Sequence, residues 1–132
     1  MNLDLGILSL ARELGGHASA RQAVIAQNVA NADTPGYKAK DIAVFSEAYD
    51  SAPTQGMALR TTRDGHFASD APPATFRTIE DTRFGAEAPN GNTVSLEDQM
   101  IRAAEAQQSH ELAMGVYRKS LDILRMSLGR GR

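Results

Sequence analysis

The chain has 132 residues, a length that suits a single domain. Its 14 basic and 16 acidic residues nearly balance, so its charge gives no reason to expect a nucleic acid as a partner. Cysteine is absent, which excludes disulfides and thiolate metal sites. No apolar run reaches the roughly 20 residues that a membrane-spanning helix needs.

The first predicted element is a long helix over residues 3–33, in an arm that contains no proline. Apolar residues recur at steps of three and four and repeat after eleven residues. They are Leu3, Ile7, Leu10, Leu14, Ala18, Ile25, Val29 and Ala32. Thr34-Pro35-Gly36 ends the helix, because the residue before a proline is pushed out of the helical region. The apolar run 5–11 lacks the basic flank of a secretory signal, so we expect no cleaved signal peptide.

The middle of the chain, residues 34–94, holds all five prolines and is predicted to be extended and irregular. Asp64-Gly65 predicts a short β-hairpin between strands at about 57–62 and 66–69. Asn90-Gly91 predicts a second turn before the last helix. Apolar residues are scattered here, so the segment adds little core.

The last predicted element is a helix over residues 95–128. Ser95 followed by Asp98 is typical of a helix N-terminus. The apolar seam steps by four and three with a polar centre. Its members are Leu96, Met100, Ala103, Gln107, His110, Met114, Tyr117, Leu121, Leu124 and Leu128. We therefore predict a mainly α fold in which the two helices pair as an antiparallel, coiled-coil-like hairpin, with His17 and His110 close to Gln107 in a polar layer.

The first helix is apolar on nearly all sides, with four charged residues between positions 3 and 32. A single partner helix cannot cover such a surface, so we expect other molecules to cover the rest. The three histidines are far apart in sequence, and no phosphate loop, nucleophile elbow or metal-binding spacing is found. The sequence therefore predicts a structural protein without catalytic residues, cofactor, metal or small-molecule substrate.

The most specific pattern is the segment 28–38, Asn-Val-Ala-Asn-Ala-Asp-Thr-Pro-Gly-Tyr-Lys. It resembles the signature with which flagellar rod and hook proteins end their first helix. The resemblance implies an assembly role for Asn28, Val29, Ala30, Asn31, Thr34, Pro35, Gly36 and Tyr37. Physically, the asparagine amides can bond backbone groups at a helix end, while Gly36 permits a turn and Tyr37 anchors the departing chain.

The short length and the segments 64–67 and 90–100 narrow the resemblance to the small proximal rod subunits, and most closely to the one nearest the membrane. Another small proximal rod subunit is the alternative. The resemblance implies export through the flagellar type III apparatus and assembly, on the periplasmic side of the inner membrane, into a hollow rod. It also implies as partners other copies, other rod proteins, the adaptor FliE, the export gate and the surrounding rings.

Two other classes of function are weighed. A membrane-surface amphipathic hairpin needs a polar face rich in Lys and Arg, whereas the first helix has only Arg12 and Arg21. A small enzyme needs an enclosed pocket, which a two-helix core does not offer. We predict instead that the helices pack through Leu3, Ile7, Leu10, Leu14, Ile25, Met100, Met114, Tyr117, Leu121 and Leu124.

Overall fold

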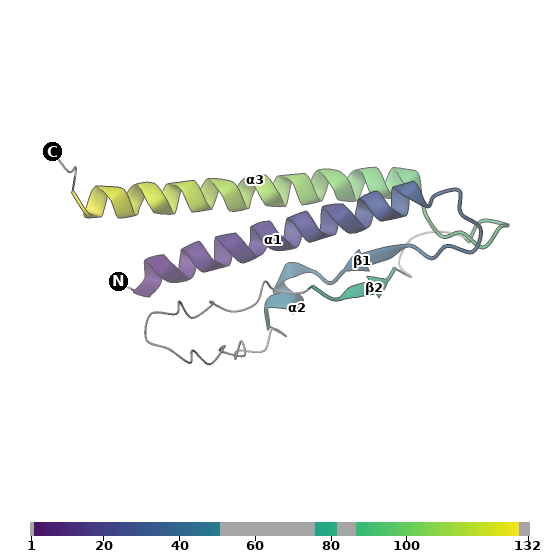
Figure 1. Cartoon of the computed structure of the whole chain (residues 1–132), viewed down its shortest axis with the longest axis horizontal. Coiled ribbons are helices and arrows are strands. Elements are labelled where there is room, and N and C mark those ends of the chain that lie inside the picture. Colours follow the sequence, from purple (N-terminus) through teal and green to yellow (C-terminus); the bar gives the residue numbers. More distant parts are fainter. Residues whose placement is uncertain (1, 51–75, 82–86, 130–132) are drawn as a thin grey trace, which may run out of the picture.

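The computed structural model describes residues 2–50, 76–81 and 87–129, without the side chains of residues 2–5 and 50. Its elements, in chain order, are the helix α1 (Asn2–Ala30), the strand β1 (Lys40–Ile42), the short helix α2 (Phe45–Asp50), the strand β2 (Thr78–Glu80) and the helix α3 (Leu96–Ser127). In Figure 1, α1 lies between α3 on one side and the segment containing β1, β2 and α2 on the other. The expectation of a mainly helical chain with one long helix at each end is confirmed.

The two long helices run antiparallel along each other (Figure 1). Gln22 donates a side-chain hydrogen bond of 3.1 Å to Gln107. Farther along, Asn28 donates one of 3.0 Å to Gln99. The sequence separation shrinks as the chain approaches the connecting segment, as an antiparallel pair requires. None of the helices in the described parts of the chain is long and apolar enough to cross a bilayer.

The ends of the helices are set by local chemistry. The hydroxyl of Ser95 accepts a hydrogen bond from the backbone N–H of Asp98 at 3.4 Å, so Ser95 caps α3 as predicted. The regular part of α1 ends at Ala30, before the predicted end at residue 33. The backbone N–H of Ala32 bonds to the carbonyl of Val29, and that of Thr34 to Asn31, so tighter turns replace the last helical turn.

The strands β1 and β2 form a two-stranded antiparallel sheet in which Asp41 pairs with Ile79. This pairing joins two distant segments of the middle region, residues 34–94, and was not predicted from the sequence. The hairpin predicted between residues 57 and 69 lies outside the described residues. The chain that leaves α1 turns back along this helix. The sheet therefore lies beside α1, on the side away from α3 (Figure 1).

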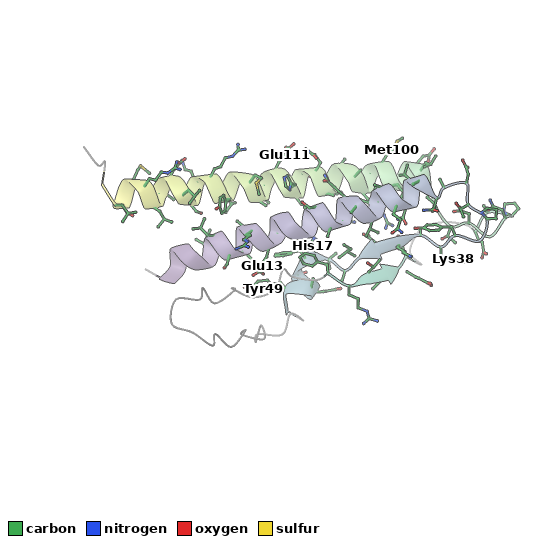
Figure 2. All side chains as sticks on the ribbon, viewed as in Figure 1. Glu13, His17, Lys38, Tyr49, Met100 and Glu111 are labelled. Carbon is green, nitrogen blue, oxygen red and sulfur yellow. The ribbon has the colours of Figure 1, made fainter. Side chains whose placement is uncertain are left out.

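The interface between the long helices is made of small and polar residues. On α3 the buried positions are Gln99, Arg102, Ala106, Ala113 and Ser120. Each precedes by one residue a position of the predicted seam, so the most buried positions of α3 are shifted by one residue from that seam. Small side chains let the two helices approach closely, and the polar ones find partners on α1 and the sheet. Figure 2 shows Met100 on the side of α3 that faces away from α1, where it is 72% exposed.

The predicted layer of His17 and His110 does not form. His17 is buried on the side of α1 that faces α2, with its Nε2 atom 2.8 Å from the carbonyl oxygen of Ala43 (Figure 2). Its ring meets the rings of Phe45 and Phe76 edge-on, at centroid distances of 5.5 and 5.0 Å. His17 thus packs the middle segment onto α1, and Gln107 bonds to Gln22 of α1 and not to a histidine layer.

Candidate functional site

Asn28, the first residue of the signature segment, is fully buried and joins three parts of the fold. Its amide nitrogen donates to the carbonyl of Lys40 at 2.6 Å and to the Gln99 side chain at 3.0 Å. Its amide oxygen accepts from the backbone N–H of Lys40 at 3.0 Å and from the Tyr37 hydroxyl at 3.2 Å. Both donors and both acceptor positions of the amide are therefore used. Asn28 ties α1 to β1 and to α3.

The end of α1 is capped by Asn92, a residue that precedes α3. Its amide nitrogen lies 2.9 Å from the carbonyl oxygen of Asn31 and 2.8 Å from those of Ala32 and Thr34. These carbonyls belong to the turns that follow the helix, where backbone acceptors lack helical partners. The Asn31 amide donates to the carbonyl of Gln27 at 2.8 Å. The segment before α3 thus closes the end of α1.

Gly36 and Tyr37 direct the chain away from the helix. Gly36 has a φ of 72°, in the left-handed region, and its N–H donates to the carbonyl of Asn90 at 2.9 Å. Gly91 has a φ of 79°, and a Cβ atom there would lie 3.4 Å from the Cα of Gly36. The two glycines let the segments leaving α1 and entering α3 approach closely. Val29, Ala30, Thr34 and Pro35 are exposed beside this junction.

Replacing Gly36 by alanine is expected to lower the free energy of unfolding by about 1–2 kcal/mol, because a side chain at positive φ is strained. Gly115 provides a control with the opposite sign. It lies inside α3 with nothing within 4 Å of an added Cβ, so Gly115→Ala should raise the free energy of unfolding by about 0.5–1 kcal/mol. Urea unfolding followed by circular dichroism measures both. Equal effects of the two substitutions would contradict the argument.

A buried ion-pair cluster attaches the sheet to the helix pair, and the sequence analysis did not identify it. Arg102, 5% exposed, pairs with Asp41 at 2.9 Å, with Asp98 at 2.7 Å and with Asp81. Arg21 approaches Asp41 from α1 at 3.1 Å. Its residues come from both long helices, from β1 and from the end of β2. The residues of this cluster are far apart in the sequence, so no local motif indicates it.

Arg21 links this cluster to the outer surface through Glu105, at 3.3 Å. Burial of the guanidinium acts to lower the pKa of Arg21, but the hydrogen bond and the charge of Asp41, followed by those of Glu105, raise its pKa on balance. Arg21 therefore stays positively charged over the whole range in which carboxylates are ionised. Its charge offsets part of the negative charge that the aspartates bring into the fold.

The residues predicted to pack the helices occupy two environments. Ile25 is buried within the chain, and Leu14, Met114, Leu121 and Leu124 are half-buried. Ile7, Leu10, Met100 and Tyr117 are 44%, 42%, 72% and 37% exposed, and the side chain of Leu3 lies outside the described ones. Further exposed apolar residues were not among the predicted packing residues, namely Ile101, Leu112, Val116, Ile123 and Met126. The most buried positions between the two helices include the small residues Ala18, Ala106 and Ala113, and these large side chains lie outside that interface.

A groove of about 370 Å³ lies between the long helices. Gly15, Gly16 and Ser19 line it from α1, and His110, Met114 and Tyr117 line it from α3. Within the described residues, no three His, Asp or Glu side chains are grouped to hold a metal ion. The groove and the exposed apolar side chains suit contacts between proteins.

Comparison with known proteins agrees with the signature segment. Residues 17–38 match the family described as flagella basal body rod protein. The chain is 53% identical over 60 residues to the flagellar basal body rod protein FlgB of Aeromonas hydrophila, covering 43% of this chain and 45% of that protein. It is 43% identical over 56 residues to FlgB of Salmonella typhimurium, covering 39% of this chain and 41% of that protein.

The matched stretches thus span less than half the length of these relatives. The residues matched by the family include the second half of α1 and the segment up to Lys38, where Asn28 and Tyr37 make their contacts. The sequence match and the hydrogen-bonded junction therefore coincide. Over these residues the chain is therefore similar to flagellar basal body rod proteins, and to FlgB in particular.

Proposed function

We propose that the chain is a structural subunit of the flagellar basal-body proximal rod and assembles with its own copies and other rod proteins into a hollow shaft. The observation that carries this proposal is the distribution of apolar side chains. The helix interface is built on Ala18, Ala106 and Ala113, whereas large apolar side chains lie outside on both helices. Burying a large apolar side chain is worth about 1.5–3 kcal/mol, so this surface favours association.

The finer parts of the function rest on the family resemblance. They are export through the type III apparatus without a cleaved signal, assembly on the periplasmic side of the inner membrane, and contacts with FliE, the export gate and the rings. In the assembled rod, neighbouring copies would cover the exposed apolar residues, while the coiled-coil-like pairing of the two helices within one chain stays a prediction. The family name describes a structural component, which agrees with a protein that catalyses no reaction.

A membrane-surface hairpin is less well supported by the described residues. Of the two arginines on α1, Arg21 is engaged by Asp41 and Glu105 within the fold. One exposed arginine, Arg12, leaves little positive charge on α1 for anionic lipid. Another small proximal rod subunit is the remaining alternative, and the two FlgB matches favour the FlgB-like assignment.

The proposal is tested by replacing exposed residues of α1 in the organism that carries the gene. Val29, 45% exposed, and Gln27, also exposed, lie on the same turn of α1. Val29→Asp is expected to abolish motility and to leave purified basal bodies without a rod, because a charge replaces an apolar contact with a neighbour. Gln27→Asp, the control, should leave motility close to that of the wild type.

Circular dichroism of the purified variants separates assembly from folding. Because Val29 is partly exposed, Val29→Asp should keep the helix content of the wild type. Deletion of the gene should abolish motility, and the wild-type gene should restore it. A motile deletion strain, or a Val29→Asp strain as motile as the Gln27→Asp strain, would contradict the proposed function.

A further inference from the structure

The outer side of α3 carries a straight row of large apolar residues. Ile101, Leu112 and Ile123 are spaced by eleven residues and are 62%, 60% and 46% exposed. Eleven residues make slightly more than three full helical turns, so side chains at this spacing nearly line up along the axis, here over about 33 Å. Met126, 71% exposed, extends the row. We refer to these four residues as the α3 stripe.

The groove between α1 and α3 faces another direction. At about 100° per residue, the α3 stripe lies roughly 120–200° around the helix from Met114, which lines the groove. A surface and its complement on nearly opposite sides of one molecule cannot pair in a closed twofold dimer. They join head to tail, and such contacts propagate into rings or filaments.

The groove contains an incomplete polar site. The Nδ1 atom of His110 is buried and has no hydrogen-bond partner among the described residues. A buried polar atom without a partner is unfavourable, so a group from outside the chain that bonds to it would stabilise the complex. The exposed residue Gln108 lies beside the stripe on α3, and its amide offers both a donor and an acceptor.

The shape of the groove also suits the stripe. On α1, Gly15, Gly16 and Ser19 carry small or no side chains, which lets a neighbouring helix approach closely. The apolar side chains of Ile101, near the start of α3, and Leu112, at its middle, are 62% and 60% exposed.

We propose that the groove receives the α3 stripe of a second copy of this chain. Each copy then binds one neighbour through its groove and another through its α3 stripe. The proposal deepens the proposed function, because it rests on self-assembly and specifies the faces that join. The groove and Leu112 both lie near the middle of the hairpin. The two meet whether the second copy runs parallel or antiparallel to the first.

The natural chain has no cysteine, so pairs of introduced cysteines can report which faces meet. The double variant Ser19→Cys/Leu112→Cys, concentrated and treated with a short bis-maleimide, should form a ladder of covalent oligomers. A mixture of the two single variants should stop at a cross-linked dimer, and each single variant alone should stay monomeric. In the control Ser46→Cys/Leu112→Cys, the first cysteine is on exposed α2, away from the groove, and the ladder should be lost.

The outcomes separate this inference from the proposed function. A double variant that stays monomeric, a ladder as strong in the Ser46 control, or cross-linked dimers of the Ser19→Cys variant alone would each overturn the head-to-tail contact. If the wild-type gene supports motility while the double variant forms no ladder, only this inference fails. If deletion of the gene leaves motility intact, the proposed function fails, and the ladder still decides whether copies join in this way.

Discussion

Replacing Arg102 by methionine is expected to lower the free energy of unfolding by about 3–5 kcal/mol, a larger loss than for the other substitutions considered. Arg102 is 5% exposed and bridges Asp41, Asp81 and Asp98. Removing one side of a buried ion pair leaves the remaining charges desolvated, which costs more than the pair contributed. Methionine keeps most of the volume of the side chain, so the loss reports charge and not a cavity.

Arg125→Met is the matched control on the same helix. Arg125 pairs with Asp122 at 3.6 Å, and its side chain is 77% exposed, so the loss should stay below about 1 kcal/mol. Arg102→Lys should fall between the two, because an ammonium group lacks the planar fork that reaches several carboxylates. Urea unfolding of the three variants measures the differences. Equal losses for Arg102→Met and Arg125→Met would show that the cluster does not hold the fold together.

The second large effect is expected for Asn28→Asp, which preserves shape and reverses hydrogen-bonding capacity. The amide nitrogen of Asn28 faces the carbonyl of Lys40 and the side-chain oxygen of Gln99, both acceptors. A carboxylate cannot donate to them and is itself fully buried, so the free energy of unfolding should fall by about 2–4 kcal/mol. The substitution would remove the hydrogen bonds by which residue 28 joins α1 to β1 and to α3 through its amide nitrogen.

The pH dependence of this loss provides a further check. Burial beside two acceptors should raise the pKa of the introduced carboxyl above its unfolded value. The loss relative to wild type should therefore be smallest below the unfolded pKa and grow as the pH rises to the folded pKa. Asn31→Asp is the control, because the Asn31 amide donates an exposed bond to Gln27. Its loss should be about 1 kcal/mol or less, and a loss as large as that of Asn28→Asp would contradict the role given to Asn28.

Local patterns in the sequence determined the two long helices and their ends. The proline-free arms predict the helices, Ser95 predicts the start of α3, and Gly36 predicts the turn that its φ of 72° shows. Each of these features depends on neighbours within a few residues. The signature segment also predicted that Asn28 bonds backbone groups and that Tyr37 anchors the chain, and the hydrogen bonds confirm both.

Only the tertiary structure decided which faces of the helices meet and what holds them. Apolar periodicity placed Met100 and Leu96 in the seam, whereas the structure buries Gln99 and Arg102 and leaves Met100 and Leu96 72% and 48% exposed. Polar residues enter a core when distant partners satisfy them, and here Asp41 lies in β1 while Asp81 directly follows β2, the strand that pairs with β1. A periodic pattern shows the polarity of each side chain but not its partner. The buried ion-pair cluster and the exposed apolar residues could therefore be identified only from the folded structure.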